Sequence, residues 1–170
     1  TCKITVTIPA TKVYLNQSLQ LKKGATLKLT ASVLPTDSTD KLTWKSSNPK
    51  KVSVNANGKI KALKTGSATI TVTTESGKSA KCKVTVVKKA TKATKVKIKS
   101  TSKTMKVGAV KQLKVTIKPA KATSTLRFKT SNKNVVSVAK NGVITAKKKG
   151  KATITVIAGK QRATIKIRVK

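Results

Sequence analysis

The sequence lacks histidine and is poor in acidic, aromatic and cysteine residues. Its 170 residues include three Asp or Glu, two Cys, one Trp, one Tyr and one Phe. Protein zinc sites are built from Cys, His and carboxylate side chains, so this composition excludes an ordinary zinc site. Calcium needs several oxygen ligands, and the only acids are Asp37, Asp40 and Glu75. We therefore expect no metal and no cofactor.

The same shortages exclude most catalytic sites. Without His, neither a Ser-His-Asp nor a Cys-His arrangement can form. A carboxylate pair for glycoside hydrolysis could come only from the three acids. Two of them, Asp37 and Asp40, lie in the run PTDSTD, where turn residues that hydrogen-bond to the local backbone are the simpler interpretation. We expect no catalytic residues and no enzymatic role.

Long hydrophobic runs are also missing. No apolar stretch approaches the roughly 18 residues that a transmembrane helix requires, and the chain opens directly with a strand-like pattern at residues 1–7. We expect no transmembrane segment, and we interpret the chain as part of a longer protein with further repeats or another domain. Cys2 and Cys82 do not make a disulfide framework.

Positive charge, by contrast, is abundant. Forty Lys and Arg residues give a net charge of +37, and residues 89–170 hold 24 of these cations without any acid. Such a chain repels itself when folded, whereas an ordinary surface mixes both signs. We infer a polyanionic partner or surrounding, against the alternative of a solvated, aggregation-resistant surface. The candidate binding residues fall in two dense runs: Lys88, Lys89, Lys92, Lys95, Lys97 and Lys99, and then Lys147, Lys148, Lys149 and Lys151.

The composition also limits which polyanion is expected. Nucleic-acid binders combine Arg with aromatic side chains that stack on bases, but Arg is rare here and Tyr14 is the aromatic expected to be exposed. Nucleic acid should bind only nonspecifically at low salt. Lys acts as a point charge that tolerates varied geometry, which suits wall teichoic acid, acidic polysaccharide or host glycan.

An internal repeat organises the chain. Residues 42–72 and 126–156 align without gaps, through motifs such as ATITV, and the repeat extends upstream. The repeat predicts domains at 9–88 and 89–170. Residues 1–8 are then the last strand of a preceding repeat or an N-terminal strand. In the first case Cys2 and Cys82 occupy equivalent positions in successive repeats, too far apart to pair. In the second, the question of pairing stays open.

Local patterns predict β-structure throughout. Apolar residues alternate with polar ones, as in Ile165–Val169, which is typical of strands with one buried face. Asn57-Gly58 and Asn141-Gly142 stand between such runs and predict tight hairpins. Trp44 and its counterpart Phe128 lie on matching strands. We expect both to be core residues and not a ligand platform. The fold class is therefore all-β, with two β-sandwich domains.

Five sequence landmarks occur in the same order in both halves of the chain, and they make each half resemble the bacterial immunoglobulin-like group 2 domain. The second copy keeps the pattern, with Phe128 replacing the tryptophan and Thr130 the first serine. The resemblance implies two tandem immunoglobulin-like β-sandwiches and no shared catalytic residues. The landmarks in the first copy are Gly24, Trp44-Lys45-Ser46-Ser47-Asn48, Val52-Ser53-Val54, Asn57-Gly58 and Gly66-Ser67-Ala68-Thr69-Ile70.

The resemblance also implies a setting, because such domains occur in bacterial surface proteins, adhesins, secreted enzymes and phage structural proteins. We expect an extracellular, non-catalytic module that acts as a spacer and as a polycationic binder of anionic polymers. The alternatives are a purely structural stalk that presents another domain, or a phage virion or tail decoration domain. Nucleic-acid binding is a further, weaker alternative.

Overall fold

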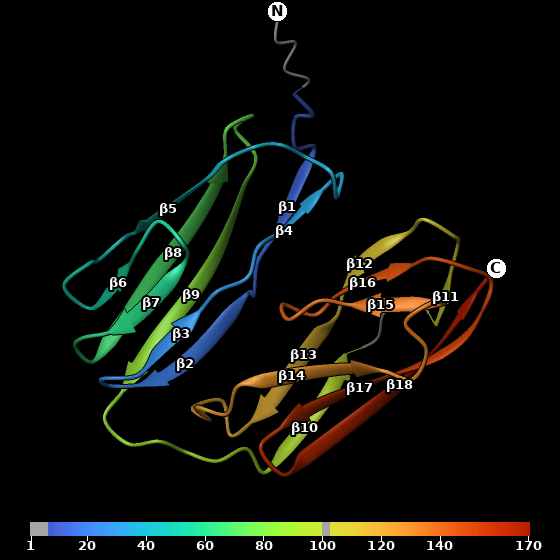
Figure 1. Cartoon of the computed structure of the whole chain (residues 1–170). Coiled ribbons are helices and arrows are strands. Elements are labelled where there is room, and N and C mark those ends of the chain that lie inside the picture. Colours follow the sequence, from blue (N-terminus) through green and yellow to red (C-terminus); the bar gives the residue numbers. More distant parts are fainter. Residues whose placement is uncertain (1–6, 100–102) are drawn as a thin grey trace, which may run out of the picture. The chain divides into compact units, whose positions relative to one another are not determined.

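The computed structural model describes residues 7–99 and 103–170, and every regular element in them is a β-strand (Figure 1). The chain divides into two compact units, Thr1–Val86 and Val87–Lys170, which we call unit 1 and unit 2. Most of the segment predicted as a preceding or N-terminal strand, residues 1–6 with Cys2, lies outside the described residues.

The strands of unit 1 form two main sheets and a short ribbon. The four-stranded sheet has the order β2-β9-β8-β5, the three-stranded sheet has the order β3-β7-β6, and β1 pairs with β4. The strands are β1 (Lys12–Tyr14), β2 (Ser18–Lys22), β3 (Thr26–Lys28), β4 (Ser32–Leu34), β5 (Leu42–Ser46), β6 (Val52–Val54), β7 (Lys59–Ala62), β8 (Gly66–Thr74) and β9 (Ser79–Val87).

Unit 2 repeats this arrangement strand for strand. Its four-stranded sheet is β11-β18-β17-β14, its three-stranded sheet is β12-β16-β15, and β10 pairs with β13. The strands are β10 (Lys95–Lys99), β11 (Thr104–Met105), β12 (Val110–Gln112), β13 (Lys114–Lys118), β14 (Leu126–Thr130), β15 (Val136–Val138), β16 (Val143–Ala146), β17 (Gly150–Ala158) and β18 (Gln161–Val169).

The alternating residues build a separate core in each unit. In unit 1, Ile60 of the three-stranded sheet and Ile70 of the four-stranded sheet are fully buried in one cluster. In unit 2, Ile144 and Ile154 occupy the corresponding places in a second cluster. Each unit is thus a two-sheet sandwich. Small β-branched and aliphatic side chains fill it, which suits a pleated, half-buried surface.

The predicted hairpins form, with turns wider than the two-residue type. Strands β6 and β7 are joined by four residues, Asn55 to Gly58, and the Gly58 N–H donates to the Asn55 carbonyl at 3.0 Å. Gly58 adopts φ 72° and no described non-glycine residue has a positive φ, so Asn57 does not take the left-handed conformation that a two-residue type I′ turn requires. The matching turn of unit 2 has the same Gly142 to Ala139 hydrogen bond, at 2.9 Å.

The aromatic residues predicted to be core pack at its edge. Trp44 and Phe128 are half-buried against the cores of their units and are not enclosed. Cys82, on β9, is fully buried as a free thiol, and desolvation raises its pKa to about 12.

Candidate anion-binding surfaces

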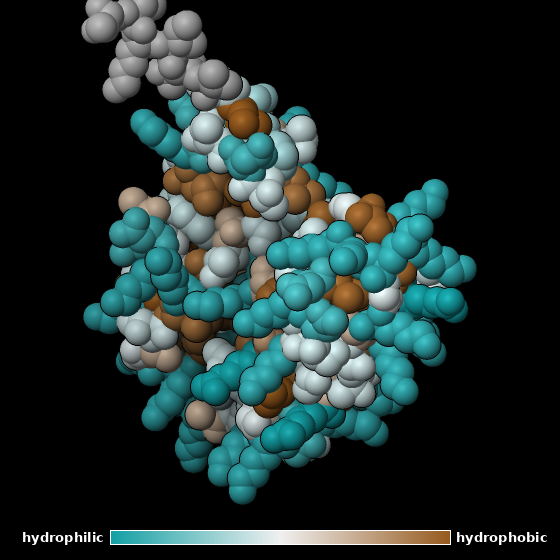
Figure 2. All heavy atoms as spheres, turned by 45° about the vertical axis from the view of Figure 1, so that its right-hand side comes forward, coloured by the Kyte–Doolittle hydropathy of each residue, from teal (hydrophilic) through white to brown (hydrophobic). Residues whose placement is uncertain are grey.

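The lysines on the described strands are exposed to solvent, except for the half-buried Lys111 on β12. Val96 is buried on β10 while Lys95, Lys97 and Lys99 are exposed, as the period of two requires. Hydrophilic side chains accordingly cover most of the surface in view in Figure 2, with small hydrophobic patches between them. The surface is therefore cationic because the alternation that places apolar residues in the core also places lysines on the exposed side of the strands.

The predicted lysines do not converge on one site. Lys88, Lys89 and Lys92 are exposed in the segment that joins β9 to β10. The next three in the run are on β10. Lys147, Lys148 and Lys149 are exposed in the turn between β16 and β17, and Lys151 follows on β17 itself. The structure therefore distributes the candidates over three places: a connecting segment, a two-stranded ribbon, and a turn with the strand that follows it.

Strand pairing brings some lysines face to face. Across the β10–β13 ribbon, Lys95 is directly opposite Lys118, and Lys99 is directly opposite Lys114. All four are exposed, and like charges directly opposite each other destabilise a sheet. We call this set, with Lys97, the lysine ribbon. Unit 2 contains no acidic side chain, so no Asp or Glu of the same unit offsets this repulsion.

Apart from Lys151, a second cationic surface was not predicted. On the outer face of the four-stranded sheet of unit 2, exposed cations on three neighbouring strands lie among threonines and Ile157. This surface holds all three arginines of the chain. We call it the arginine face, and its members are Arg127, Lys129, Lys151, Arg162, Lys166 and Arg168. Alternation within β14 and β18 was visible in the sequence, but the adjacency of these strands to β17 was not.

Two of the three acids of unit 1, Asp40 and Glu75, accept hydrogen bonds between loops. Oδ2 of Asp40 accepts hydrogen bonds from the Ser76 backbone N–H, at 2.9 Å, and from the Ser76 hydroxyl. The Ser76 hydroxyl bond and then its N–H bond lower the pKa of Asp40. Glu75 accepts a long bond of 3.5 Å from the Lys41 N–H. The expectation of purely local turn bonds at Asp40 was wrong, because these contacts join the β4–β5 loop to the distant β8–β9 hairpin.

The acidic and thiol side chains that the structure describes do not assemble into a metal-type cluster. Within residues 7–99 and 103–170, no three or more His, Cys, Asp or Glu side chains gather as a metal site would need. The same residues contain no helix with the length and hydrophobicity of a membrane span.

Known proteins share this sequence pattern. The family model for the bacterial Ig-like domain (group 2) matches residues 5–86 and 92–168. Lacto-N-biosidase of Bifidobacterium bifidum is 49% identical over 65 residues, which is 38% of this chain and 6% of that protein. Alpha-L-arabinofuranosidase of Bifidobacterium longum subsp. longum is 34% identical over 135 residues, covering 78% of this chain and 13% of that protein.

Among solved structures, domains 4 and 5 of the S-layer protein SbsC align over 95% of this chain and 99% of that chain, with 20% identity and a TM-score of 0.40. The chain spans only a small part of the length of the two curated relatives. Because the family model covers nearly the whole chain in two consecutive segments, the chain belongs to the bacterial Ig-like domain (group 2) family and carries two tandem copies of that domain.

Proposed function

We propose that the chain is a non-catalytic module of a bacterial cell-surface or secreted protein, and that it associates with anionic polymers of the cell envelope while it spaces other domains. The relatives named above are glycosidases in which the matching segment is a small part. That proportion fits an accessory role, because a domain of this size attached to a much longer enzyme need not supply the chemistry.

The observation that carries the proposal is the set of like-charge pairs on the lysine ribbon. Lys95 faces Lys118 and Lys99 faces Lys114 in a unit that has no acid. Opposed lysines cost stability on an isolated sheet, but a bound polyanion converts the same pairs into favourable contacts. Each contact with an exposed lysine is weak, so binding would depend on many lysines acting together.

The proposed partners are wall teichoic acid, acidic polysaccharide or host glycan. Lysine-rich surfaces attract any dense array of negative charge, so nucleic acid is expected to compete at low salt without sequence preference. The alternative is a purely structural stalk whose charge merely suits an anionic wall.

Retention of the protein on purified Gram-positive cell walls tests the proposal. Walls with and without teichoic acid would be compared across a salt series from about 50 to about 500 mM, since screening weakens contacts between exposed charges over this range. Retention that falls steeply with salt supports the proposal, and dependence on teichoic acid would identify that polymer. Retention unaffected by salt, or no retention at low salt, would leave the stalk as the better description.

A further inference from the structure

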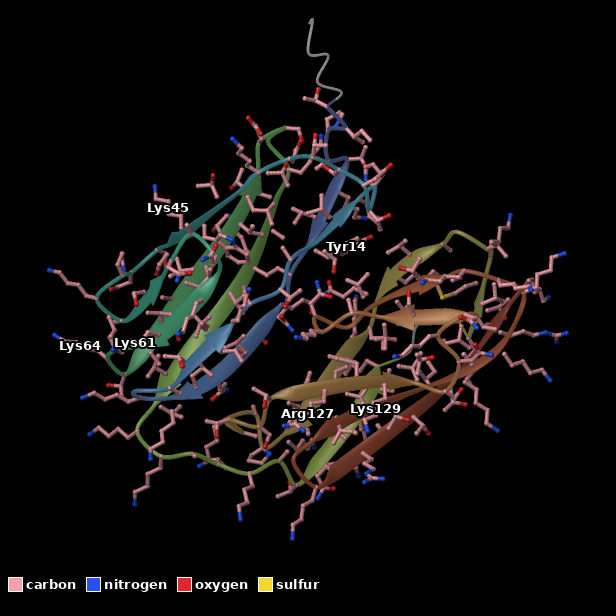
Figure 3. All side chains as sticks on the ribbon, viewed as in Figure 1. Tyr14, Lys45, Lys61, Lys64, Arg127 and Lys129 are labelled. Carbon is pink, nitrogen blue, oxygen red and sulfur yellow. The ribbon has the colours of Figure 1, made fainter. Side chains whose placement is uncertain are left out.

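The three arginines of the chain share one face of one sheet. Arg127 lies on β14, and Arg162 and Arg168 lie on β18. These two strands flank β17, and the strand registers align Arg127, Ile157 and Arg162 in one row across the sheet. All three guanidinium-bearing side chains are exposed. Figure 3 labels Arg127 with its neighbour Lys129 on β14.

The equivalent face of unit 1 is polar but carries fewer cations. The registers match Arg127 to Thr43, Arg162 to Ser79 and Arg168 to Thr85. Lys151 corresponds in the same way to Ser67, so these four cations of unit 2 stand where unit 1 has hydroxyls. The other two, Lys129 and Lys166, correspond to Lys45 and Lys83, and Thr164 corresponds to Lys81. The fold therefore does not require these cations, and their concentration on unit 2 needs another explanation.

One end of the arginine face is hollowed and strongly basic. The hollow at this end is open and measures about 550 Å³. Its lining includes the cations Lys103, Lys151, Lys166 and Arg168, with the hydroxyls of Ser131 and Thr153 between them. The Thr153 N–H donates to Ser131 Oγ at 2.9 Å, which fixes that hydroxyl beside the cations. The hollow thus offers both positive charge and hydrogen-bonding hydroxyls.

The other end adds an apolar surface. Ile157 is only half-buried, and it lies between Arg127 and Arg162 in the row described above. With Arg127 it lines a second hollow of about 420 Å³. Since neighbouring strands are about 4.8 Å apart, the backbones that carry the two arginines are separated by about 10 Å. This separation leaves room for a sugar ring to lie on Ile157, with its acidic substituent directed toward Arg127 or Arg162.

We propose that the arginine face of unit 2 binds an acidic polysaccharide whose sugar rings carry carboxylates. This inference rests on the proposed association with anionic polymers and assigns it to one face and one chemistry. The planar guanidinium matches a carboxylate with two parallel hydrogen bonds, which a lysine cannot do. Ile157 contacts the apolar face of a sugar ring, and the Ser and Thr hydroxyls bind sugar hydroxyls. A polyol phosphate has no ring that could lie on Ile157, so it is a weaker ligand than the acidic polysaccharide.

The length of the face suits a polymer better than a single sugar. From the Arg127–Arg162 row to the row in which Lys151 pairs with Arg168, β18 advances by six residues, or about 20 Å at the usual rise of a strand. Cations are present at both ends and between them. Several consecutive sugars can therefore contact the face at once, and their contacts add.

The test measures binding of three probes by calorimetry at an ionic strength of about 0.15 M. Polygalacturonate supplies rings with carboxylates, its methyl ester supplies the same rings without charge, and poly(glycerol phosphate) supplies charge without rings. The face variant is Arg127→Thr, Arg162→Ser and Arg168→Thr, which installs the unit 1 residues. The matched control, on the equivalent face of unit 1, is Lys45→Thr, Lys81→Thr and Lys83→Thr, which removes the same number of exposed charges.

We expect polygalacturonate to bind more tightly than poly(glycerol phosphate), and the methyl ester to bind least. The face variant should lose about tenfold in affinity for polygalacturonate, because three exposed charge contacts of ordinary strength together amount to about that factor. The control variant should lose much less. Replacing the three arginines by lysine should give an intermediate loss, since charge is kept and the two-bond geometry is not. Circular dichroism would verify that each variant is folded.

Other outcomes separate the two proposals. Equal losses in the face and control variants would overturn the arginine face while leaving polyanion association intact. Equal binding of poly(glycerol phosphate) and polygalacturonate would overturn the assignment to sugar rings. No binding of any charged probe by the unaltered protein would count against the proposed function itself.

Discussion

Gly58 lies directly against the ring of Trp44. A Cβ atom built on Gly58 would be 2.8 Å from Cζ2 of the indole, and one built on Gly142 would be 2.9 Å from Cζ of Phe128 in unit 2. The two repeats thus pack a turn glycine against an aromatic ring in the same way. In each unit the turn between two strands of the three-stranded sheet closes over an aromatic side chain from the four-stranded sheet, so the turn and the aromatic residue depend on each other.

Replacing Gly58 by alanine should destabilise unit 1 by about 2–5 kcal/mol. The left-handed backbone conformation at φ 72° costs a non-glycine residue about 1–2 kcal/mol, and overpacking against the ring costs about 1–3 kcal/mol more. Denaturant unfolding followed by fluorescence measures this directly, because Trp44 is the only tryptophan and reports on unit 1.

Gly24→Ala is the matched control for this prediction. Gly24 also has a positive φ, 86°, but nothing lies within 4 Å of the position that a Cβ atom would take there. The Gly24→Ala variant should therefore lose only the stability that a left-handed backbone conformation costs a non-glycine residue. Equal losses in the two variants would mean that contact with the indole does not contribute.

Asp40→Asn should lower the melting temperature of unit 1 and leave that of unit 2 unchanged. Ser76 holds the pKa of Asp40 below the ordinary value of 3.8, so the folded state favours the carboxylate. The resulting stabilisation is present above the unfolded pKa and is lost as the pH falls through the lower folded pKa. The difference in melting temperature between the unaltered protein and Asp40→Asn should accordingly shrink in acid. A difference that is constant from about pH 7 down to about pH 2 would contradict this account.

The sequence predicted much of the fold because its signals are local. Alternation of apolar and polar residues predicted the strands and the exposure of lysines such as Lys97, and the repeat predicted two copies of one domain. Neighbouring strands such as β14 and β17 are not consecutive in the chain, so their registers are set by packing of the whole sandwich. For that reason the sequence could not predict that Arg127 and Arg162 share a row, or that Lys95 faces Lys118.

Cys82 should react with thiol reagents only when unit 1 unfolds. Its side chain is fully buried on β9, and the thiolate is the reactive form, so a pKa raised to about 12 leaves almost no reactive form at about pH 8. In a Cys2→Ser background, labelling with a water-soluble disulfide reagent should be slow in buffer and rapid in denaturant. Fast labelling under native conditions would show that β9 is accessible.

The raised pKa of the Cys82 thiol predicts that the stability of unit 1 depends on pH. The folded pKa of Cys82 is raised from 9.0 to about 12, so the unfolded chain releases this proton first. Its contribution to stability is complete below about pH 9 and declines by about 1.4 kcal/mol per pH unit from there to about pH 12. Relative to Cys82→Ala, the unaltered protein should therefore lose stability over this range, as measured by denaturant unfolding at several pH values. A constant difference between the two proteins would contradict the burial of the thiol.

Lys118→Glu should stabilise unit 2 at low salt. The new carboxylate would be directly opposite Lys95 across the β10–β13 ribbon, and replacing a like-charge pair by an opposite-charge pair in a sheet is expected to contribute about 0.5–2 kcal/mol. The gain should shrink at high salt, where exposed charges are screened. Lys121→Glu changes the net charge equally but lies in the loop between β13 and β14, with no cross-strand partner. If both variants raised the melting temperature of unit 2 equally, general self-repulsion, and not the facing pair Lys95 and Lys118, would be the source of the instability.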